Sequence, residues 1–513
     1  MTTSPTGRCF LRTRTGTRAA IVGATLVLRL PYVAHHNLYS DELVPGVVAL
    51  HALAEARPIL ECYGRPGNAG ELVQAYLALP FFALFGADER WLALATVAIT
   101  VAMVLLFHHL AARGFGEPVA LLAALSVALP PPELWRATVW VNTHNVGLAL
   151  GLALIAWSDS LAASGAPGVV SAALLGAVLP VCGWLNPMAL VIAAPALPLA
   201  LGRRAVAPRR LAAGTAALAL GALATRALWG PTLAFVIGPA PGAGADGRIA
   251  ASAARLGATF TAGLARGLGF ASELPRTGGA LDAGMAGLLA VSYLAFAARA
   301  LRRGDVAPEA SRGFRRAALA VPPLVGLAIA ASSRDGSKYW LYALPFLFLA
   351  WGSVLARAPR ALAWPAAALF LAGSAYTCAR TIDSVHDDVV TRLVAHLRAR
   401  GIDRVYTDDA LKWPLTFVSR EAIVAAGELP SRYPDHEREV FASPHAAVVL
   451  SDVSPVRGAV EAALSRAGAT HDTSEVGDFV VWSAFDRDVR CALRDVYRAN
   501  AALFPPELCL ESP

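Results

Sequence analysis

The stretch LPYVAHHNLYSDE (residues 30–42) connects the first apolar segment of the chain to an acidic pair, Asp41-Glu42. Two carboxylates at the mouth of a membrane span are costly to hold near lipid, and ionisable groups in that position commonly belong to a functional site. A solvated loop end that happens to be acidic explains the pair equally well when the stretch is considered alone. The remainder of the sequence decides between these two interpretations.

The composition of the chain is that of a membrane protein. Of its 513 residues, 56% are hydrophobic and only 16% are charged, whereas soluble globular proteins carry about 25% charged residues. Long apolar runs recur from residue 18 to residue 378, which predicts a polytopic α-helical membrane protein. The net charge of +7 arises from Arg residues clustered in short loops between these runs. Such clusters set membrane topology, so they do not indicate a nucleic-acid partner.

The cysteines and the N-terminus give weaker signals. The six cysteines contain neither a CxxC pair nor a metal-like spacing. Cys491 and Cys509 could form a disulfide if the C-terminus faces an oxidising compartment. The Arg-rich N-terminus and the apolar run after it resemble a signal peptide, but no small-residue cleavage site follows. We therefore expect an uncleaved first span.

Eleven apolar runs are interpreted as membrane spans, although several are shorter than the roughly 20 residues that a helical span requires. A further apolar run occupies residues 71–86. The eleven predicted spans are residues 18–34, 91–111, 117–132, 143–157, 168–184, 187–202, 211–229, 283–300, 316–331, 339–356 and 361–378.

Basic loops orient these spans, because the positive-inside rule places Arg-rich loops in the cytoplasm. Counting back from the loop at 203–210 puts both residue 35 and the turn at 86–90 outside, so the run at 71–86 cannot cross. We expect this run to be a juxtamembrane helix within one external loop at 35–90. The count predicts a cytoplasmic N-terminus and an external C-terminus. The four Arg-rich loops are residues 8–18, 203–210, 299–316 and 357–360.

The composition changes after Arg380. Residues 384–513 are charged and mixed, contain no spanning run and have no GxGxxG or P-loop sequence, so nucleotide chemistry is not indicated. We expect a transmembrane domain at 1–380, which includes the external loop, and a small extracytoplasmic α/β domain at 381–513. The predicted elements of the second domain are helices at 386–401 and 456–467 and strands at 403–407, 421–426, 446–450 and 478–482.

Two polar groups are candidates for ligand binding near the outer face. Asn142 and His144, in WVNTHN (residues 140–145), could bind sugar hydroxyls or assist proton transfer. Asn and Thr are also common helix N-caps, which is the alternative role of this segment. In the external loop, Arg65 is a polar group available near Asp41, and a solvated loop residue is the alternative there.

Two cations begin a later span in SSRDGSKYW (residues 332–340). Arg334 and Lys338, the latter followed by Tyr339, could hold a lipid phosphate at the outer interface. Alternatively, the two side chains only snorkel to the lipid headgroups. Lys occurs elsewhere only at position 412, which favours a functional role for Lys338.

These features together resemble the GT-C superfamily of membrane glycosyltransferases. The most similar group is that of the protein O-mannosyltransferases and lipid A aminoarabinose transferases (glycosyltransferase family 39). The likeness runs over most of residues 18–380, and the acidic pair after the first span is its most specific part. The matching segments are Arg29-Leu30, Tyr39-Ser40-Asp41-Glu42, Pro80, Leu84-Phe85-Gly86, Arg90-Trp91-Leu92, Lys338-Tyr339 and Leu344-Pro345-Phe346.

The chain departs from the family pattern at three places. Arg65-Pro66-Gly67 stands where the family often has Lys-Pro-Pro, and Lys338 replaces the more usual Arg. Asn142 and His144 occupy the place where a second acidic residue is expected.

The resemblance implies a polyprenyl-phosphate-linked sugar as the donor and Asp41 as the catalytic base, with Glu42 beside it. The chemistry of glycosyl transfer is consistent with this interpretation. The outer side of a membrane has no supply of nucleotide sugars, and attack by an acceptor hydroxyl needs a base within hydrogen-bond reach. The leaving phosphate needs cationic stabilisation, which Lys338, Arg334 or Arg65 could supply. Asp41 and Glu42 could also hold a divalent cation, but two carboxylates alone do not define a metal site.

We therefore expect a multi-pass, inverting glycosyltransferase of the inner (plasma) membrane that acts on a hydroxyl of a glycan, lipid or protein at the external face. A transporter or lipid flippase is the main alternative, although such proteins tend to show internal repeats and mid-membrane charges. A non-catalytic cell-envelope scaffold is the third reading. The expected substrate-binding residues are Arg65, Asn142, His144, Arg334, Lys338 and Tyr339.

Overall fold

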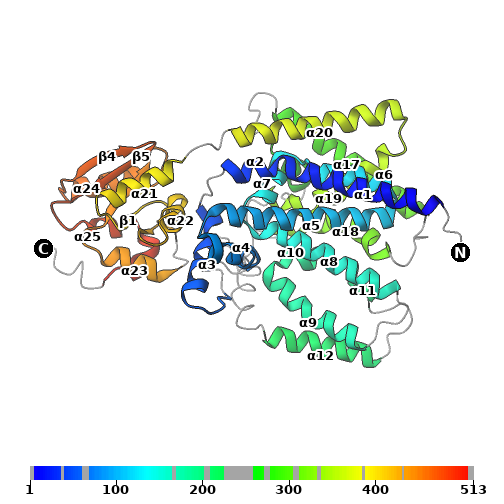
Figure 1. The fold of residues 1–513 in the computed structure, drawn as a ribbon, viewed down its shortest axis with the longest axis horizontal. Helices are drawn as coiled ribbons and strands as arrows, with labels where there is room; N and C mark the ends of the chain where they lie inside the picture. Colours follow the sequence, from blue (N-terminus) through cyan, green and yellow to red (C-terminus); the bar gives the residue numbers. More distant parts are fainter. Residues whose placement is uncertain are drawn as a thin grey trace. The chain divides into compact units, whose positions relative to one another are not determined.

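The computed structural model describes most of the chain, and Figure 1 shows its helices and strands. The described residues form two compact units, each of which combines segments that are far apart in the sequence. Unit 1 contains Met1–His35, Pro66–Glu71 and Ala93–Ser384; unit 2 contains His36–Arg65, Leu72–Leu92 and Val385–Pro513. The described residues are 5–35, 40–60, 69–163, 169–200, 208–224, 258–270, 278–303, 311–331, 337–383, 388–429 and 433–505.

Unit 1 is built from apolar helices. In the described part of the chain, six helices are long and apolar enough to cross a membrane, or seven if the bent pair α6–α7 is one span. The chain is thus a multi-pass membrane protein, and the count of eleven spans stays a prediction. The helices are α1 (Pro5–Val27), α2 (Arg29–His35), α5 (Glu89–Phe115, which begins in unit 2), α6 (Glu117–Ala128), α7 (Pro132–Val139), α8 (Thr143–Ala163), α9 (Val169–Leu185), α10 (Pro187–Ala193), α11 (Leu197–Ala200), α12 (Pro208–Ala224), α15 (Leu264–Arg266), α17 (Gly278–Arg303), α18 (Arg312–Ala331), α19 (Leu344–Leu355) and α20 (Arg360–Asp383), with the π-helix η3 (Thr259–Gly263) and the 3-10 helix η5 (Ser337–Tyr342).

The predicted span at 117–132 is interrupted, because α6 ends at Ala128 and α7 leaves at an angle of 75°. Three successive prolines, at 130–132, lack the N–H groups that would continue the helix. The fully buried guanidinium of Arg29 donates to the carbonyl oxygen of Ala128 over 2.7 Å. It also donates to Oγ1 of Thr138 over 2.8 Å, so it links the two halves of the break. A cation at a helix C-terminus satisfies carbonyls that have no partner within the helix.

Small residues let the helices of unit 1 approach closely, as is common in membrane bundles. A Cβ atom on Gly176 of α9 would lie 2.3 Å from the carbonyl oxygen of Gly214 in α12. A Cβ atom on Gly151 of α8 would lie 2.8 Å from Cβ of Ile192 in α10. The backbone of α9 therefore packs directly on the backbone of α12, and the backbone of α8 packs on the side chain of Ile192 in α10.

Unit 2 contains a five-stranded sheet with the order β2-β1-β3-β5-β4. The first three neighbours are parallel, and β5 and β4 are antiparallel additions at one edge. The strands are β1 (Arg404–Tyr406), β2 (Val424–Ala426), β3 (Ala447–Ser451), β4 (Asp472–Val476) and β5 (Phe479–Ser483). The helices are α21 (Val389–Ala399), α22 (Asp409–Val418), α23 (Pro434–Ala442), α24 (Arg457–Arg466), α25 (Arg490–Arg494) and the 3-10 helix η6 (Arg498–Leu503).

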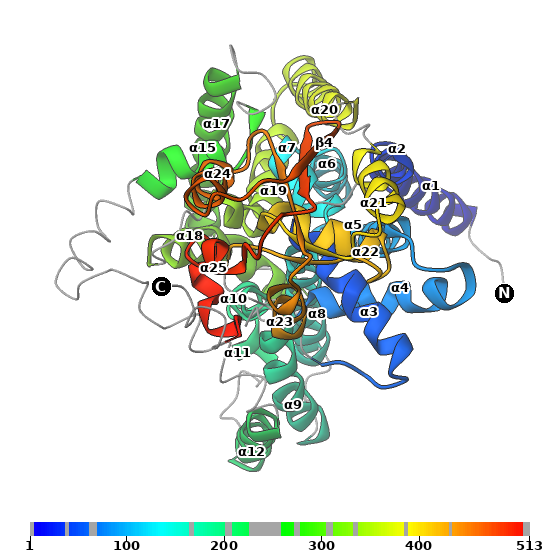
Figure 2. The ribbon, with the colours of Figure 1, turned by 90° about the vertical axis from the view of Figure 1, so that its left-hand side faces the viewer.

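Alternating side chains of the strands divide these helices between two layers. Figure 2 shows the helices of unit 2 from a second side. Val449 and the strand side chains on the same face of the sheet pack against α21 and α22. Val448 and Leu450 lie on the other face and pack against α23, α24 and α25. The predicted strands at 403–407, 446–450 and 478–482 are confirmed, and the strand at 421–426 is shorter than predicted because Glu421 lies in a turn. Strand β4 was not predicted, since its sequence DTSEV is polar and mostly exposed at the sheet edge.

The predicted external loop contributes three elements to unit 2: the 3-10 helix η1 (Ser40–Leu43), α3 (Val44–Ala54) and nearly all of α4 (Glu71–Phe85). Both η1 and α3 contact α22. The ring of Phe417 in α22 packs so closely on Gly46 that a Cβ atom there would lie 2.5 Å from it. The same ring lies 5.8 Å from that of Phe82 in α4. The acidic pair is thus part of a helical segment packed on the α/β part of unit 2.

Candidate functional site

The predicted site residues are divided between the two units. Asn142, His144 and Tyr339 belong to unit 1, whereas Asp41 and Glu42 lie in η1 of unit 2. The side chain of Glu42 is half-buried. Arg65, Arg334 and the side chains of Asp41 and Lys338 lie outside the described residues.

Asn142 has the capping role that was the alternative to sugar binding. Its Oδ1 accepts a hydrogen bond from the backbone N–H of His144 over 2.7 Å, which satisfies one of the N–H groups at the start of α8. Its Nδ2 donates to the carbonyl oxygens of Trp140 and Ala137 over 2.9 and 3.2 Å. Asn142 therefore sets the direction in which α8 begins and positions the next residues of the site.

His144 is the centre of a polar network in unit 1. Its Nδ1 lies 2.9 Å from the phenol oxygen of Tyr342, in η5. The same phenol oxygen accepts a hydrogen bond from Nδ2 of Asn186 over 2.9 Å. An amide N–H can only donate, so the proton of the buried phenol is directed to His144. The network therefore assigns the acceptor role to Nδ1 of His144 and leaves the proton of the neutral ring on Nε2.

The imidazole of His144 is also held by aromatic contacts. Its ring centroid lies 5.6 Å from that of Tyr339 and 5.7 Å from that of Tyr342, with interplanar angles of 88° and 81°. Edge-to-face pairs of this kind are favourable because the ring edge is positive and the ring face is negative. The structure thus brings together two of the predicted site residues, His144 and Tyr339, which are far apart in the sequence.

Asn186 connects this network to three helices. One N–H of its Nδ2 is directed to Tyr342, and the other is shared between the carbonyl oxygen and Oγ1 of Thr143, at the start of α8, over 2.9 and 3.0 Å. Its Oδ1 accepts from the backbone N–H of Met188 and so caps α10. Asn186 and Tyr342 were not predicted as site residues. The Asn186-Pro187 pair carries the usual signal of a helix N-terminus, with an Asn cap before a proline.

The segment before α4 packs on the same network. The backbone N–H of Gly70 donates to the carbonyl oxygen of Leu185 over 2.7 Å, and Oγ1 of Thr143 donates to the same oxygen over 3.1 Å. A Cβ atom on Gly70 would lie only 2.2 Å from Oγ1 of Thr143. Glu71, which follows, is a buried carboxylate at the start of α4.

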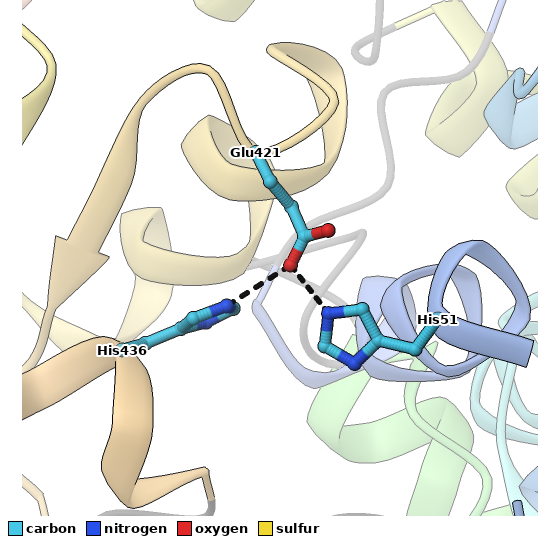
Figure 3. A group of neighbouring side chains, drawn as sticks. All are labelled: His51, Glu421 and His436. Atoms are coloured by element: carbon cyan, nitrogen blue, oxygen red, sulfur yellow. Dashed lines mark hydrogen bonds and ion pairs between the residues drawn. The ribbon is translucent and has the colours of Figure 1, made fainter. Parts of the chain in front are cut away.

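A second polar cluster lies in unit 2 and consists of His51, Glu421 and His436 (Figure 3). In the described part of the chain, this group has the residue types and the spacing of a metal site. Partial burial would raise the pKa of Glu421, but hydrogen bonds from His436 and His51 outweigh burial and lower this pKa to about 2. The carboxylate is therefore ionised at neutral pH.

The helical bundle of unit 1 and the small α/β sheet of unit 2 have the fold of solved structures that belong to the GT-C superfamily. No protein-family profile and no curated protein sequence matches the chain. The fold is recognised in solved structures, and the fold resemblance inferred from the sequence is confirmed.

Two structures of ArnT from Cupriavidus metallidurans, a lipid A aminoarabinose transferase, are similar to this chain. Its apo structure is 13% identical with a TM-score of 0.58, and the alignment covers 96% of this chain and 100% of ArnT. Its structure bound to undecaprenyl phosphate is 14% identical with the same TM-score, covering 91% and 98%. The archaeal oligosaccharyltransferase AglB from Archaeoglobus fulgidus, in complex with an inhibitory peptide and a dolichol-phosphate, is 12% identical with a TM-score of 0.51, covering 85% and 69%. At these identities the likeness establishes the fold.

Proposed function

We propose that the chain is an integral-membrane glycosyltransferase that moves a sugar from a polyprenyl-phosphate donor to an acceptor hydroxyl. The observation that carries this proposal is the fold likeness over the whole length of ArnT, a transferase with a structure bound to undecaprenyl phosphate. The structure of AglB with a dolichol-phosphate supports the same class of lipid carrier. The two similar proteins are transferases, which favours this function over a transporter, a flippase or a scaffold.

In the proposed reaction, Asp41 is the general base. It takes the proton of the acceptor hydroxyl while the acceptor oxygen attacks the anomeric carbon and the bond from that carbon to the phosphate oxygen breaks. One displacement of this kind inverts the anomeric configuration and releases the polyprenyl phosphate. Glu42 orients the loop beside Asp41. Packing of η1 on α22 supports this assignment, because a base needs a fixed backbone to hold its geometry.

The departing phosphate carries the developing charge, and we assign its stabilisation to Arg65, Arg334 and Lys338. The network around His144 has a complementary part. It holds the imidazole in one tautomer and one orientation next to Tyr339, as substrate positioning requires. Asn142 acts through His144, because its contacts are with the backbone around the start of α8.

We place the reaction at the outer face of the inner membrane, with a cytoplasmic N-terminus and an external C-terminal domain. The Arg-rich loops support this orientation. Cys491 is disulfide-bonded, as is usual in oxidising compartments. Four large apolar side chains of α4 are exposed, which supports a helix lying in the membrane interface: Leu77, Phe81, Leu84 and Phe85.

The test uses the purified full-length protein in lipid with a panel of undecaprenyl-phosphate sugars, and measures release of undecaprenyl phosphate. Asp41→Asn keeps the size of the side chain and removes the base, so turnover should fall by about 10²–10⁴-fold. Asp435→Asn is the matched control, because that carboxylate is exposed on α23. Full turnover in Asp41→Asn alongside active wild-type protein would remove Asp41 from the mechanism. Absence of phosphate release by the wild type with every donor would overturn the proposed class.

A further inference from the structure

The carboxylate of Glu421 lies between two imidazoles that come from distant parts of unit 2 (Figure 3). Its Oε1 is 2.6 Å from Nε2 of His51 in α3 and 3.0 Å from Nε2 of His436 in α23. These ligand-type atoms all lie within 4.8 Å of one another. Three side chains that are separated by up to 385 positions in the sequence therefore direct their polar atoms to one point.

We propose that His51, Glu421 and His436 bind a divalent transition-metal ion, with zinc as the preferred ion, and that this ion clamps α3 to the α/β part of unit 2. Two imidazole nitrogens and one carboxylate oxygen are a typical set of zinc ligands. Magnesium and calcium prefer oxygen ligands, so the two imidazoles favour a transition metal over these ions. The proposal is independent of the proposed transferase activity.

The observed spacing suits such an ion. With metal–ligand bonds of about 2.0–2.1 Å in a tetrahedron, ligand atoms are about 3.3 Å apart. From their distances of 2.6 and 3.0 Å to Oε1, the nitrogens of His51 and His436 therefore need to move away by about 0.7 and 0.3 Å. In the absence of an ion the imidazole N–H groups bind the carboxylate directly, and the ion replaces those two protons.

The backbone around Glu421 aims its carboxylate into the cluster. Arg420 and Glu421 both have positive φ angles, of 53° and 61°, which non-glycine residues rarely adopt. The backbone N–H of Glu421 donates to the carbonyl oxygen of Thr416 over 2.8 Å and so holds this turn at the end of α22. Strained residues that persist in such turns are found preferentially at ligand clamps.

The surroundings allow an ion to enter and stay. The side chains of His51 and His436 are only 11% and 7% exposed, whereas that of Glu421 is 28% exposed. The rings of Tyr433 and Trp413 lie 4.6 and 6.3 Å from that of His436 and exclude water on that side. The ion therefore reaches the cluster along Glu421, and water occupies its fourth position.

One feature sets the expected strength of binding. The buried Nδ1 of His436 has no hydrogen-bond partner among the described residues. A metal-bound imidazole normally donates its second N–H to such a partner, and loss of that partner weakens metal binding by about 10–100-fold. We therefore expect an exchangeable ion that a strong chelator removes without denaturing the protein.

The test titrates chelator-stripped, full-length protein in detergent with zinc chloride against a chromophoric competitor, and measures bound zinc by mass spectrometry. One zinc ion per chain is expected. His51→Gln and His436→Gln retain an N–H donor to Glu421 but lose the metal ligand, and Glu421→Gln loses the carboxylate. Each of these three substitutions should weaken zinc binding by more than roughly 100-fold. This is more than the loss caused by removing only the hydrogen-bond partner of a metal-bound imidazole. His445→Ala, at an exposed position, is the control and should bind zinc like the wild type.

Cobalt gives a second readout on the wild type alone, because a tetrahedral site with imidazole ligands shows visible d–d absorption. The proposal is wrong if stripped wild-type protein takes up no zinc, since the cluster is then only a hydrogen-bonded pair of imidazoles on a carboxylate. It is equally wrong if zinc binds with the same affinity in all three variants. Unfolding of a Gln variant, detected by size-exclusion chromatography, leaves the wild-type stoichiometry and the cobalt spectrum to decide.

Discussion

The side-chain amide of Asn186 donates a hydrogen bond to the phenol oxygen of Tyr342 over 2.9 Å, although 156 positions separate the two residues. This bond connects the start of α10 to the end of η5, and through Tyr342 it fixes the imidazole of His144. A buried donor and acceptor of this kind are expensive to leave unpaired. The pair therefore supports both the packing of unit 1 and the tautomer of His144.

Asn186→Ala should lower the free energy of unfolding by about 1–3 kcal/mol, because Tyr342 and Thr143 lose a buried donor. A double-mutant cycle with Tyr342→Phe isolates the bond between the two side chains. We expect a coupling energy of about 1 kcal/mol, within the range for residues in one hydrogen-bond network. Denaturant unfolding in detergent measures all four proteins. Strictly additive effects of the two substitutions would contradict the network.

Arg29→Met should destabilise unit 1 by about 3 kcal/mol. Three buried acceptors lose their donor at a cost of roughly 1–3 kcal/mol each. Removal of the buried charge offsets part of this cost. The acceptors are the carbonyl oxygens of Ala128 and Thr25 and Oγ1 of Thr138. Thermal unfolding in detergent provides the measurement. Arg380→Met, an exposed position near the end of α20, should change stability by no more than about 0.5 kcal/mol. Equal effects of the two substitutions would mean that Arg29 does not hold the α6–α7 break.

Lys412 and Glu437 form a fully buried ion pair between α22 and α23. Removing one partner strands a buried charge, so Lys412→Met or Glu437→Gln alone should cost about 3–5 kcal/mol. The double substitution Lys412→Met with Glu437→Leu should recover most of that loss, because a well-packed apolar pair can replace a buried ion pair. Thermal unfolding of the full-length protein reports each variant.

The exposed pair of Arg438 and Asp435 on α23 is the matched comparison. Asp435→Ala should change stability by less than about 1 kcal/mol, as is typical of surface pairs. If the double substitution at 412 and 437 were as unstable as the sum of its single substitutions, the buried pair would not act as a unit.

The proposed orientation predicts the labelling of introduced cysteines. Asp88→Cys should react with an impermeant thiol reagent added outside intact cells, in excess of the wild-type background. Arg302→Cys, in a predicted cytoplasmic loop, should react only after the membrane is opened. Mass-tag gel shifts measure both. The reverse pattern would invert the topology, and reaction of Asp88→Cys only after opening would make α4 a membrane span.

Local sequence patterns were sufficient to predict those elements in which the spacing of apolar residues matches the side chains that are buried. The strands β1, β3 and β5 alternate between two apolar faces, and their positions were predicted. Helices α22 and α23 were not predicted, and α22 contains Pro414, a residue that usually ends a helix. In the membrane part, apolar runs located the helices but did not reveal that α6 ends at Ala128.

The candidate sites show where sequence reasoning stops. His144 and Tyr339 could be nominated separately, but their contact depends on how α8 and η5 pack. His51 and His436 are isolated histidines in the sequence, and Glu421 was predicted to lie in a strand. Convergence of the three follows from the packing of α3 on α22, a tertiary relationship that no local spacing records.

Unit 2 takes its first segments from before residue 93 and its remainder from after residue 384. On the ribosome, synthesis of the roughly 290 residues between them takes about 15–60 s at the usual elongation rate of 5–20 residues per second. During that interval α3 and α4 have been translated while α22, against which α3 packs, does not yet exist. The apolar face of α3 must therefore be sheltered by the membrane surface or by a chaperone until translation ends. A chain cut short after Ser384 would leave that face permanently without its partner, and cellular quality control should remove it quickly.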